Sequence, residues 1–442
     1  MSAATRHSAW LLLVWAVAVL AGCASLGPEL PMASGDDPGP QELSLGVRTL
    51  GPDGEFEVLP SSLIARRLEA RFPDRALTLL ALSGGGASGA FGAGAVVGLT
   101  RSGSRPEFSV VTGVSAGALI APFAFLGPSW DPEMAAIYTE EIDKSLLQPR
   151  LIGAVFGSSM YSGTPLRRLI DRYADDRMLE AVATEAARGR LLLVATTDFA
   201  TGEPVIWDLG SIALYGGRDA RQLFRSVLLA SASVPGMFPP VVINVRTRGG
   251  LHEETHVDGG VTLPFFIAPA PEDLPQFTGV GGQPTVVRII IDGRLRDLPR
   301  GAKANALSIF SRSVSAGLSR MTRTTLEQTV AATRGRGISL DYAAIPVAYP
   351  LQGSFDFDPE AQRVLFTYAS TCTEAGRLWT RVQQTSADPA AERRIVSAGT
   401  TCPADDQFIG RFAALEDRAH ARQPEPSGGL ERVGWSVAKP VD

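Results

Sequence analysis

The amino-acid sequence predicts an α/β fold with a mainly parallel central sheet. Short apolar runs alternate with longer amphipathic stretches along most of the chain, which is the order expected of repeated strand–helix–strand units. Glycine-rich turns directly follow two of these apolar runs, as expected where a buried strand leads into a helix. The chain has 442 residues, of which 45% are hydrophobic, enough apolar material for one large domain or two ordinary ones.

The individual elements follow from the same alternation. Apolar runs predict the strands, residues 201–202 and 249–250 predict turns between strands, and Thr164 followed by Pro165 favours a helix start. The expected strands cover residues 77–82, 108–112, 191–196, 205–207, 241–245, 254–257 and 286–291. The expected helices cover residues 92–100, 116–126, 131–145, 164–188, 218–230, 303–334 and 359–383.

The first residues have the pattern of a processing segment. Arg6 precedes an apolar run over residues 8–22, which is too short for a transmembrane helix and ends at Cys23. This end resembles the lipobox of bacterial lipoproteins, whose cysteine is lipidated and becomes the first residue. The alternatives are an ordinary secretory signal and an anchor helix with a chance cysteine. With Ala24 after the cysteine, the resemblance implies a lipid-anchored protein of the bacterial cell envelope, in the outer membrane, on its periplasmic or surface side.

The predicted domain boundaries follow from composition. Residues 1–22 are the signal peptide, and residues 23–75 are expected to form a lipidated N-terminus and a flexible tether, because proline and glycine are frequent over residues 24–60. Residues 76–385 carry the strand–helix alternation and form the predicted globular domain. Residues 386–442 are expected to form a C-terminal extension that ends in a loose, polar tail.

Charge and residue counts exclude several classes of function. The chain has 41 basic and 46 acidic residues and a net charge of −5, so no basic field points to nucleic acid as a partner. Three cysteines are too few for a disulfide scaffold or a cysteine zinc cluster. If Cys23 is acylated, Cys372 and Cys402 remain as a candidate disulfide; buried free thiols are the alternative.

The first motif is the glycine-rich loop at residues 83–89, between an expected strand and an expected helix. Glycines leave amide N–H groups exposed, so such a loop can bind a phosphate or stabilise an oxyanion. Gly84, Gly86 and Gly89 also match a dinucleotide-binding pattern. That pattern expects an acidic residue at the end of the next strand, whereas Glu107 lies at its start. A purely structural turn remains a further possibility.

The second motif is Gly113, Ser115 and Gly117, which together form a G-x-S-x-G sequence. A strand-like run precedes the serine and a helix-like run follows it, which is the context of a nucleophile elbow. The helix N-terminus behind Ser115 would supply free amides and a positive dipole for developing negative charge. A serine in an ordinary tight turn is the alternative.

The third motif is Asp258, Gly259 and Gly260. It is significant because the chain has only four histidines. A nucleophilic serine needs a base, and in an α/β-hydrolase triad the histidine follows the acid in the chain. Only His420, in the polar tail, follows Asp258. A serine–aspartate pair is therefore favoured over a triad.

Residues 252–256 match the zinc-binding pattern H-E-x-x-H, but the metal interpretation requires a helix. Glycine pairs flank the segment, and Thr255 and Val257 favour a strand. On a strand, His252 and His256 would be about 13 Å apart. We therefore expect no metal and two ordinary, exposed hairpin histidines.

The three motifs, in this order, resemble the pattern of patatin-like phospholipases. The segment 230–240 is similar to the proline-containing stretch that precedes the family's aspartate, and residues 197–203 are similar to a strand–turn–strand segment of the family. The similarity covers residues 77–295. The resemblance implies a three-layer α/β/α fold and a serine–aspartate dyad that hydrolyses lipid acyl esters.

The resemblance also implies roles for individual residues. Ser115 would be the nucleophile and Asp258 the base, with membrane lipid as the substrate and no cofactor. The family usually has arginine or lysine where this chain has Ser88, which removes a positive charge near the loop. A non-catalytic envelope lipoprotein of the same fold, with a binding role, is the alternative; the oligomeric state is open. The implied oxyanion-hole residues are Gly84, Gly85, Gly86 and Ala116, and the other motif positions are Gly89, Gly113, Gly117, Gly259 and Gly260.

Overall fold

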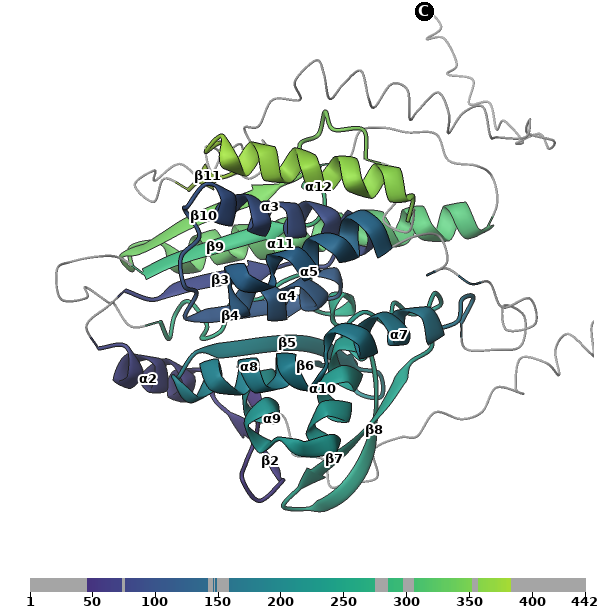
Figure 1. Cartoon of the computed structure of the whole chain (residues 1–442). Helices are drawn as coiled ribbons and strands as arrows, with labels where there is room; N and C mark the ends of the chain where they lie inside the picture. Colours follow the sequence, from purple (N-terminus) through teal and green to yellow (C-terminus); the bar gives the residue numbers. More distant parts are fainter. Residues whose placement is uncertain are drawn as a thin grey trace, which may run out of the picture.

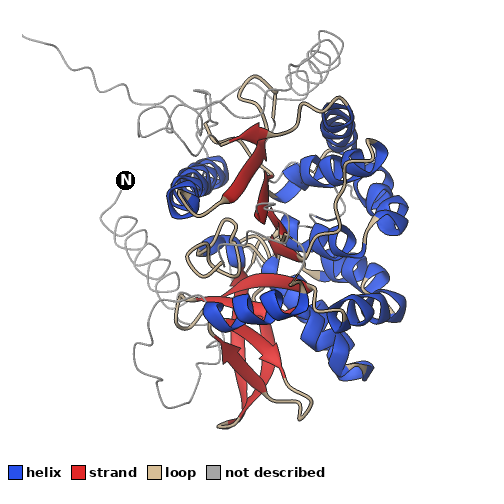
Figure 2. Cartoon of the chain, turned by 90° about the vertical axis from the view of Figure 1, so that its left-hand side faces the viewer, coloured by secondary structure: helices blue, strands red, loops and turns tan. Residues whose placement is uncertain are grey.

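The computed structural model describes residues 46–382 with gaps, and in this part of the chain it forms a layered α/β fold. The gaps are residues 74–75, 142–145, 147, 149–158, 275–284, 297–305 and 352–356. One sheet of eleven strands has the order β11-β10-β9-β3-β4-β5-β6-β1-β2 along its main path, with β7 and β8 joined through β5. Helices cover both faces of this sheet (Figure 2). The predicted α/β class is confirmed.

The centre of the sheet is parallel. Strands β3 (Thr78–Leu82), β4 (Val110–Val114), β5 (Leu191–Asp198), β9 (Thr285–Ile291) and β10 (Ile338–Ala344) pair in parallel in the order β10-β9-β3-β4-β5. Most of their residues are buried, because helices cover both faces, and this is why they occur in the sequence as continuous apolar runs. Parallel pairing brings the carboxyl ends of β3 and β4 to the same edge of the sheet.

The margins of the sheet are antiparallel. Strand β6 (Pro204–Asp208) and strand β8 (Gly250–Asp258) both pair with β5 in the antiparallel sense. Strand β7 (Val241–Thr247) forms the predicted hairpin with β8. Strand β11 (Thr380–Arg381) pairs antiparallel with β10. Because β8 ends beside β5, Asp258 lies near the carboxyl end of β4.

The helices form two layers of unequal size. Buried side chains of most helices pack on one face of the sheet, and α2 (Ser61–Arg71) and α11 (Ala306–Thr333) pack on the other. In the larger layer, α12 lies directly against α3 (Figure 1), where a Cβ on Gly94 would be 2.2 Å from the Phe366 carbonyl oxygen. The helices of the larger layer are α3 (Gly89–Arg101), α4 (Ala116–Leu126), α5 (Asp131–Ala136), α7 (Thr164–Tyr173), α8 (Asp176–Ala187), α9 (Leu209–Tyr215), α10 (Gly217–Ser231) and α12 (Pro359–Glu374).

The predicted tether is wrong over its second half. Strands β1 (Val47–Leu50) and β2 (Phe56–Leu59) belong to the central sheet, where β1 pairs in parallel with β6. Helix α2 follows and buries Ile64 and Leu68. The two described prolines of this segment have local roles, because Pro52 lies in the turn between the two strands and Pro60 is the N-cap of α2.

Two predicted helices are interrupted. The predicted helix 164–188 is two helices, because α7 ends at Tyr173 and Asp175 then caps α8 by accepting the Met178 amide at 2.9 Å. In the described part of the predicted helix 131–145, α5 is followed by a π-helical turn, Ile137–Glu141. The predicted helix 359–383 ends at Glu374, where the chain turns into β11.

No helix within the described part of the chain is long and apolar enough to cross a membrane. The predicted signal peptide and Cys23 lie outside the described residues.

Candidate active site

Ser115 occupies a sharp turn between β4 and α4. Its backbone φ is 55°, and it is the only non-glycine residue with positive φ in the described part of the chain. The Ser115 amide donates to the Ser231 hydroxyl at 3.0 Å, which anchors the turn. Gly113 and Gly117 allow the close approach, because a Cβ on Gly117 would lie 2.4 Å from the Leu82 carbonyl oxygen. The strand–turn–helix geometry predicted for the G-x-S-x-G sequence is therefore present.

Asp258 lies within hydrogen-bonding distance of this serine. The Ser115 Oγ donates to Asp258 Oδ2 at 2.6 Å, and both residues are buried. The Gly260 amide donates to the other carboxylate oxygen at 2.7 Å. Gly259 is required by packing, because a Cβ there would lie 2.4 Å from the Ala195 carbonyl oxygen. The turn thus holds the carboxylate beside the hydroxyl.

Burial sets the acidity of this carboxyl group. Desolvation raises the pKa of Asp258 to about 7, even though the hydrogen bonds from Ser115 and Gly260 lower it. A carboxylate with a pKa near neutrality is a much better proton acceptor than an exposed one. No histidine of the described residues hydrogen-bonds to either group.

The glycine-rich loop follows β3 and lies beside Ser115. Gly86 has a positive φ of 58°, and it lines the same pocket as Ser115 and Ala116. Gly85 lies against Asp292, where a Cβ would be 2.0 Å from a carbonyl oxygen. Among the described residues, no acceptor takes the amides of Gly85, Gly86 or Ala116. These three amides are therefore open to a ligand.

One predicted oxyanion-hole residue is wrong. The Gly84 amide donates to the Pro264 carbonyl oxygen at 3.0 Å, so it is occupied within the protein. Ser88, which stands where the family usually has a cation, is 2% exposed in the short 3₁₀ turn at the end of the loop. Gly89 lies close to α4, where a Cβ would be 2.9 Å from the Ala116 Cβ.

The space beside Ser115 is an apolar pocket. Its volume is about 50 Å³, and the helices α4 and α7 supply much of its wall. A second apolar cavity of about 30 Å³ shares three wall residues with it, Leu119, Tyr138 and Leu169. The pocket at Ser115 is lined by Gly86, Ser115, Ala116, Leu119, Tyr138, Leu146, Leu166, Leu169, Ala232, Val234, Phe238 and Phe357.

The H-E-x-x-H segment lies on strand β8, as predicted, but its histidines are not both exposed. His256 is fully buried and hydrogen-bonds to Thr196 at 3.0 Å and to Glu254 at 3.0 Å. His252 bonds to the other oxygen of Glu254 at 3.1 Å. The prediction fails for His256 because the strand packs its side chain edge-on against Trp207.

Glu254 is the centre of a structural cluster on β8. Burial would raise the pKa of Glu254, but His256 and Arg48 hold it at about 2. Among the described residues, no group of three potential ligands could hold a metal ion. His420 lies outside the described residues.

The predicted disulfide is only partly within the described chain. Cys372 lies on α12, is 2% exposed and is disulfide-bonded. Cys402 lies outside the described residues, so the pairing stays a prediction.

Sequence reasoning missed two residues that support the site. Ser231 links the elbow to β5, because its hydroxyl donates to the Ala195 carbonyl oxygen at 2.7 Å while accepting the Ser115 amide. Asp292 lies beneath the glycine-rich loop and accepts the Gly92 amide at 2.7 Å. The only sequence signal for Asp292 was its place directly after a buried strand, where site residues of parallel sheets gather.

Comparison with known proteins identifies the domain that contains this site. A family model described as patatin-like phospholipase matches residues 80–270, the segment that holds Ser115 and Asp258. These residues are similar to a patatin-like phospholipase domain. The mostly parallel sheet between two helical layers is consistent with the patatin fold that the resemblance implied.

The chain is also similar to VipD from Legionella pneumophila, whose crystal structure it matches with 11% sequence identity and a TM-score of 0.30. The match covers 86% of this chain and 79% of that chain. No curated protein matches the chain.

Proposed function

We propose that this protein is a serine lipid acyl hydrolase that uses Ser115 as its nucleophile and Asp258 as its base. The observation that carries the proposal is the 2.6 Å hydrogen bond from the Ser115 hydroxyl to the buried Asp258 carboxylate. The family to which residues 80–270 belong suggests lipid acyl hydrolysis. The strained turn at Ser115 exposes its hydroxyl to the apolar pocket, as a nucleophile requires.

The first half of the reaction acylates the serine. Asp258 Oδ2 accepts the hydroxyl proton while Ser115 Oγ bonds to the acyl carbonyl carbon, and the carbonyl oxygen becomes an oxyanion. The open amides of Gly86 and Ala116, with Gly85 beside them, donate to that oxyanion at the N-terminus of α4. When the tetrahedral intermediate collapses, the alcohol leaves and takes the proton from Asp258.

The second half returns the enzyme to its starting state. Water gives a proton to Asp258 as its oxygen attacks the acyl-serine carbon, and the same amides stabilise the second oxyanion. The Ser115 oxygen then leaves and takes its proton back from Asp258, releasing the fatty acid. Asp258 therefore acts alternately as base and acid, which a pKa of about 7 suits.

The pocket supports a lipid substrate. Apart from the loop and the serine, its lining side chains are aliphatic or aromatic, so it favours an alkyl chain over a polar acyl group. A hydrolysis profile across lipid classes would identify the preferred head group and acyl position, and would show whether the substrate is a phospholipid or a simple ester.

The catalytic proposal is tested by substitution and labelling. Ser115→Ala and Asp258→Asn should each lower ester hydrolysis by about 1,000-fold or more, while their far-ultraviolet circular dichroism stays that of the parent. A fluorophosphonate probe should label the parent protein but not Ser115→Ala, and Ser102→Ala, an exposed serine outside the site, should be labelled normally. A parent protein that neither hydrolyses esters nor reacts with the probe would instead fit a non-catalytic lipoprotein with a binding role.

The proposal includes a lipid anchor at Cys23 and a place in the bacterial envelope. The lipobox-like sequence supports the anchor, and in the sequence Cys23 precedes the first described strand, which begins at Val47. Mass spectrometry of the mature N-terminus should find acyl mass on Cys23, and Cys23→Ser should abolish it. An unmodified N-terminus elsewhere would refute the anchor.

A further inference from the structure

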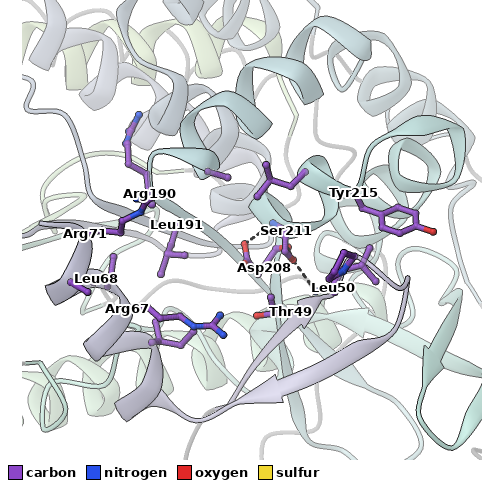
Figure 3. A pocket seen from close by; sticks show the side chains of 17 residues that line it. Thr49, Leu50, Arg67, Leu68, Arg71, Arg190, Leu191, Asp208, Ser211 and Tyr215 are labelled. Atoms are coloured by element: carbon purple, nitrogen blue, oxygen red, sulfur yellow. Dashed lines mark hydrogen bonds between the residues drawn. The ribbon is translucent and has the colours of Figure 1, made fainter.

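A much larger cavity lies at the opposite edge of the sheet from Ser115. Its volume is about 570 Å³, within the range of small-molecule sites, and it shares no lining residue with the pocket at Ser115. Ser115 follows the carboxyl end of β4, whereas this cavity is bounded by Leu191 at the start of the parallel strand β5. We call it the α2 cavity, because α2 forms one wall; Figure 3 shows its lining.

The walls of the α2 cavity are mainly apolar. Leu214 and Tyr215 on α9 are 53% and 48% exposed, which is unusual for such large apolar side chains that are grouped together. They leave an open apolar entrance rather than a closed core. The apolar lining residues are Leu50, Pro52, Ile64, Leu68, Ala70, Ala186, Leu191, Leu214 and Tyr215.

Two guanidinium groups lie at this cavity on one face of α2. Arg67 and Arg71 are one helical turn apart, and both are exposed and line the cavity. Arg71 donates to the Ala187 carbonyl oxygen at 2.8 Å, and no carboxylate of the described residues pairs with it. Arg67 makes no hydrogen bond or ion pair with any described residue. In Figure 3 it reaches from α2 toward Thr49 and Asp208.

The other charged groups that line the cavity already have partners within the protein. Arg190 pairs with Glu185 at 2.8 Å and donates to the carbonyl oxygens of Phe108 and Phe125. Asp208 is buried as the N-cap of α9 and accepts the Ser211 amide at 3.1 Å. Desolvation raises the pKa of Asp208 to about 6, although Arg67 and the Ser211 and Gly210 amides lower it. The cavity therefore carries a net positive charge at its α2 side.

We propose that the α2 cavity binds a single-chain amphiphile with an anionic head group. The alkyl chain lies against the apolar walls, and the head group accepts hydrogen bonds from Arg67 and Arg71, which suit carboxylate and phosphate oxygens. A fatty acid or a lysophospholipid-like phosphate ester has this chemistry. Both heads fit the same pair of guanidinium groups, while the buried Asp208 carboxyl keeps the anionic head near α2. Binding here does not require hydrolysis at Ser115.

The experiment uses the full chain with Ser115→Ala, so that no probe can be hydrolysed. Isothermal titration with dodecanoate, dodecyl phosphate and dodecyltrimethylammonium, each below its critical micelle concentration, compares two anionic heads with a cationic one. We expect one or both anions to bind, the tighter one identifying the natural head group, and the cation to bind at least tenfold more weakly. Equal binding of all three would overturn the proposal.

A matched pair of variants on α2 tests the residues. Arg67→Gln should weaken anion binding about tenfold, as expected for the loss of one charge-assisted hydrogen bond. Arg66→Gln removes the same charge from the neighbouring exposed position, which does not line the cavity, and should leave binding unchanged. If both variants weakened anion binding equally, the cause would be a general electrostatic attraction, and the proposed binding site would be wrong.

Photo-crosslinking locates the alkyl chain. A dodecanoate bearing a diazirine at its far end, followed by peptide mapping, should label peptides of α2 or α9 in the Ser115→Ala protein. Labelling confined to α4 and α7 would mean that the amphiphile occupies only the pocket at Ser115, and the proposal would fail. Because no readout depends on hydrolysis, this failure is distinguishable from a failure of the proposed function.

Discussion

Asp292 shows how much the candidate site depends on a residue that does not face it. Its Oδ1 accepts the Gly92 amide, and its backbone lies directly against Gly85 in the glycine-rich loop. Burial raises the pKa of Asp292 well above its usual range, although the hydrogen bond from the Gly92 amide lowers it. We regard it as a positioning residue for the loop.

This assignment predicts opposite results for two substitutions. Asp292→Asn keeps the shape and an oxygen that can accept the Gly92 amide, so it should retain most ester hydrolysis and the parent's melting temperature. Asp292→Ala leaves the buried Gly92 amide unpaired, which costs about 1–3 kcal/mol, and should also lower kcat by letting the loop shift. Both are read from esterase kinetics and thermal unfolding. If asparagine were as harmful as alanine, the hydrogen bond to the Gly92 amide would not be the role of Asp292.

The acidity of Asp258 predicts the pH dependence of the reaction. The carboxyl group must be ionised to accept the Ser115 proton, and burial raises its pKa to about 7. The ionised fraction grows as pH rises, so kcat/KM should increase about tenfold per pH unit below pH 7 and level off above it. The measurement is kcat/KM for a soluble ester between pH 5 and 9. A plateau that already begins at pH 5 would mean that the carboxylate has the acidity of an exposed one.

At the scale of elements, α4 and α7 together line two adjacent apolar cavities, one of which contains Ser115. On α7, Leu166 lines the pocket at Ser115, Leu169 lines both cavities, and Ile170 and Tyr173 line the second cavity. These positions share one helix face over about 10 Å. Leu119 on α4 and Tyr138 on the π-helical turn complete the partition between the two cavities.

The partition predicts a limit on acyl-chain length. Leu169→Ala should join the two cavities and raise the ratio of kcat/KM for a palmitate ester over a butyrate ester several-fold. Leu63→Ala removes an equally half-buried leucine from α2, outside both cavities, and should leave that ratio at the parent value. An unchanged ratio in Leu169→Ala would show that the acyl chain leaves Ser115 by another route.

At the scale of the whole molecule, β1 sets the N-terminal boundary of the described domain. Deleting residues 1–45 should leave a soluble protein with the parent's melting temperature, because Val47 and the sheet remain. Deleting residues 1–75 removes two strands and α2, which exposes the apolar side chains beneath them. That protein should aggregate or melt far lower, as read by gel filtration and thermal unfolding. If the two truncated proteins were equally stable, the original prediction of a tether up to residue 75 would be right.

Local patterns predicted the parts of the molecule that depend on local chemistry. The elbow at Ser115 and the strand bearing His256 could be predicted because small residues and β-branched residues act on their own turn or strand. The sheet position of β1, the burial of His256 and the occupied amide of Gly84 could not. Each depends on a partner distant in sequence: β6, Trp207 and Pro264, respectively.

The opposite positions of the Ser115 pocket and the α2 cavity have a consequence for how lipid reaches the protein. A bilayer is flat, so a domain whose Ser115 pocket faces it must turn the other edge of its sheet toward water. An amphiphile that fills the α2 cavity then arrives as a dissolved monomer rather than by lateral diffusion. Two-chain lipids leave a bilayer too rarely for that route, because each buried methylene contributes about 0.8 kcal/mol. If the proposed hydrolase acts on a membrane, the α2 cavity would therefore bind single-chain lipids from solution.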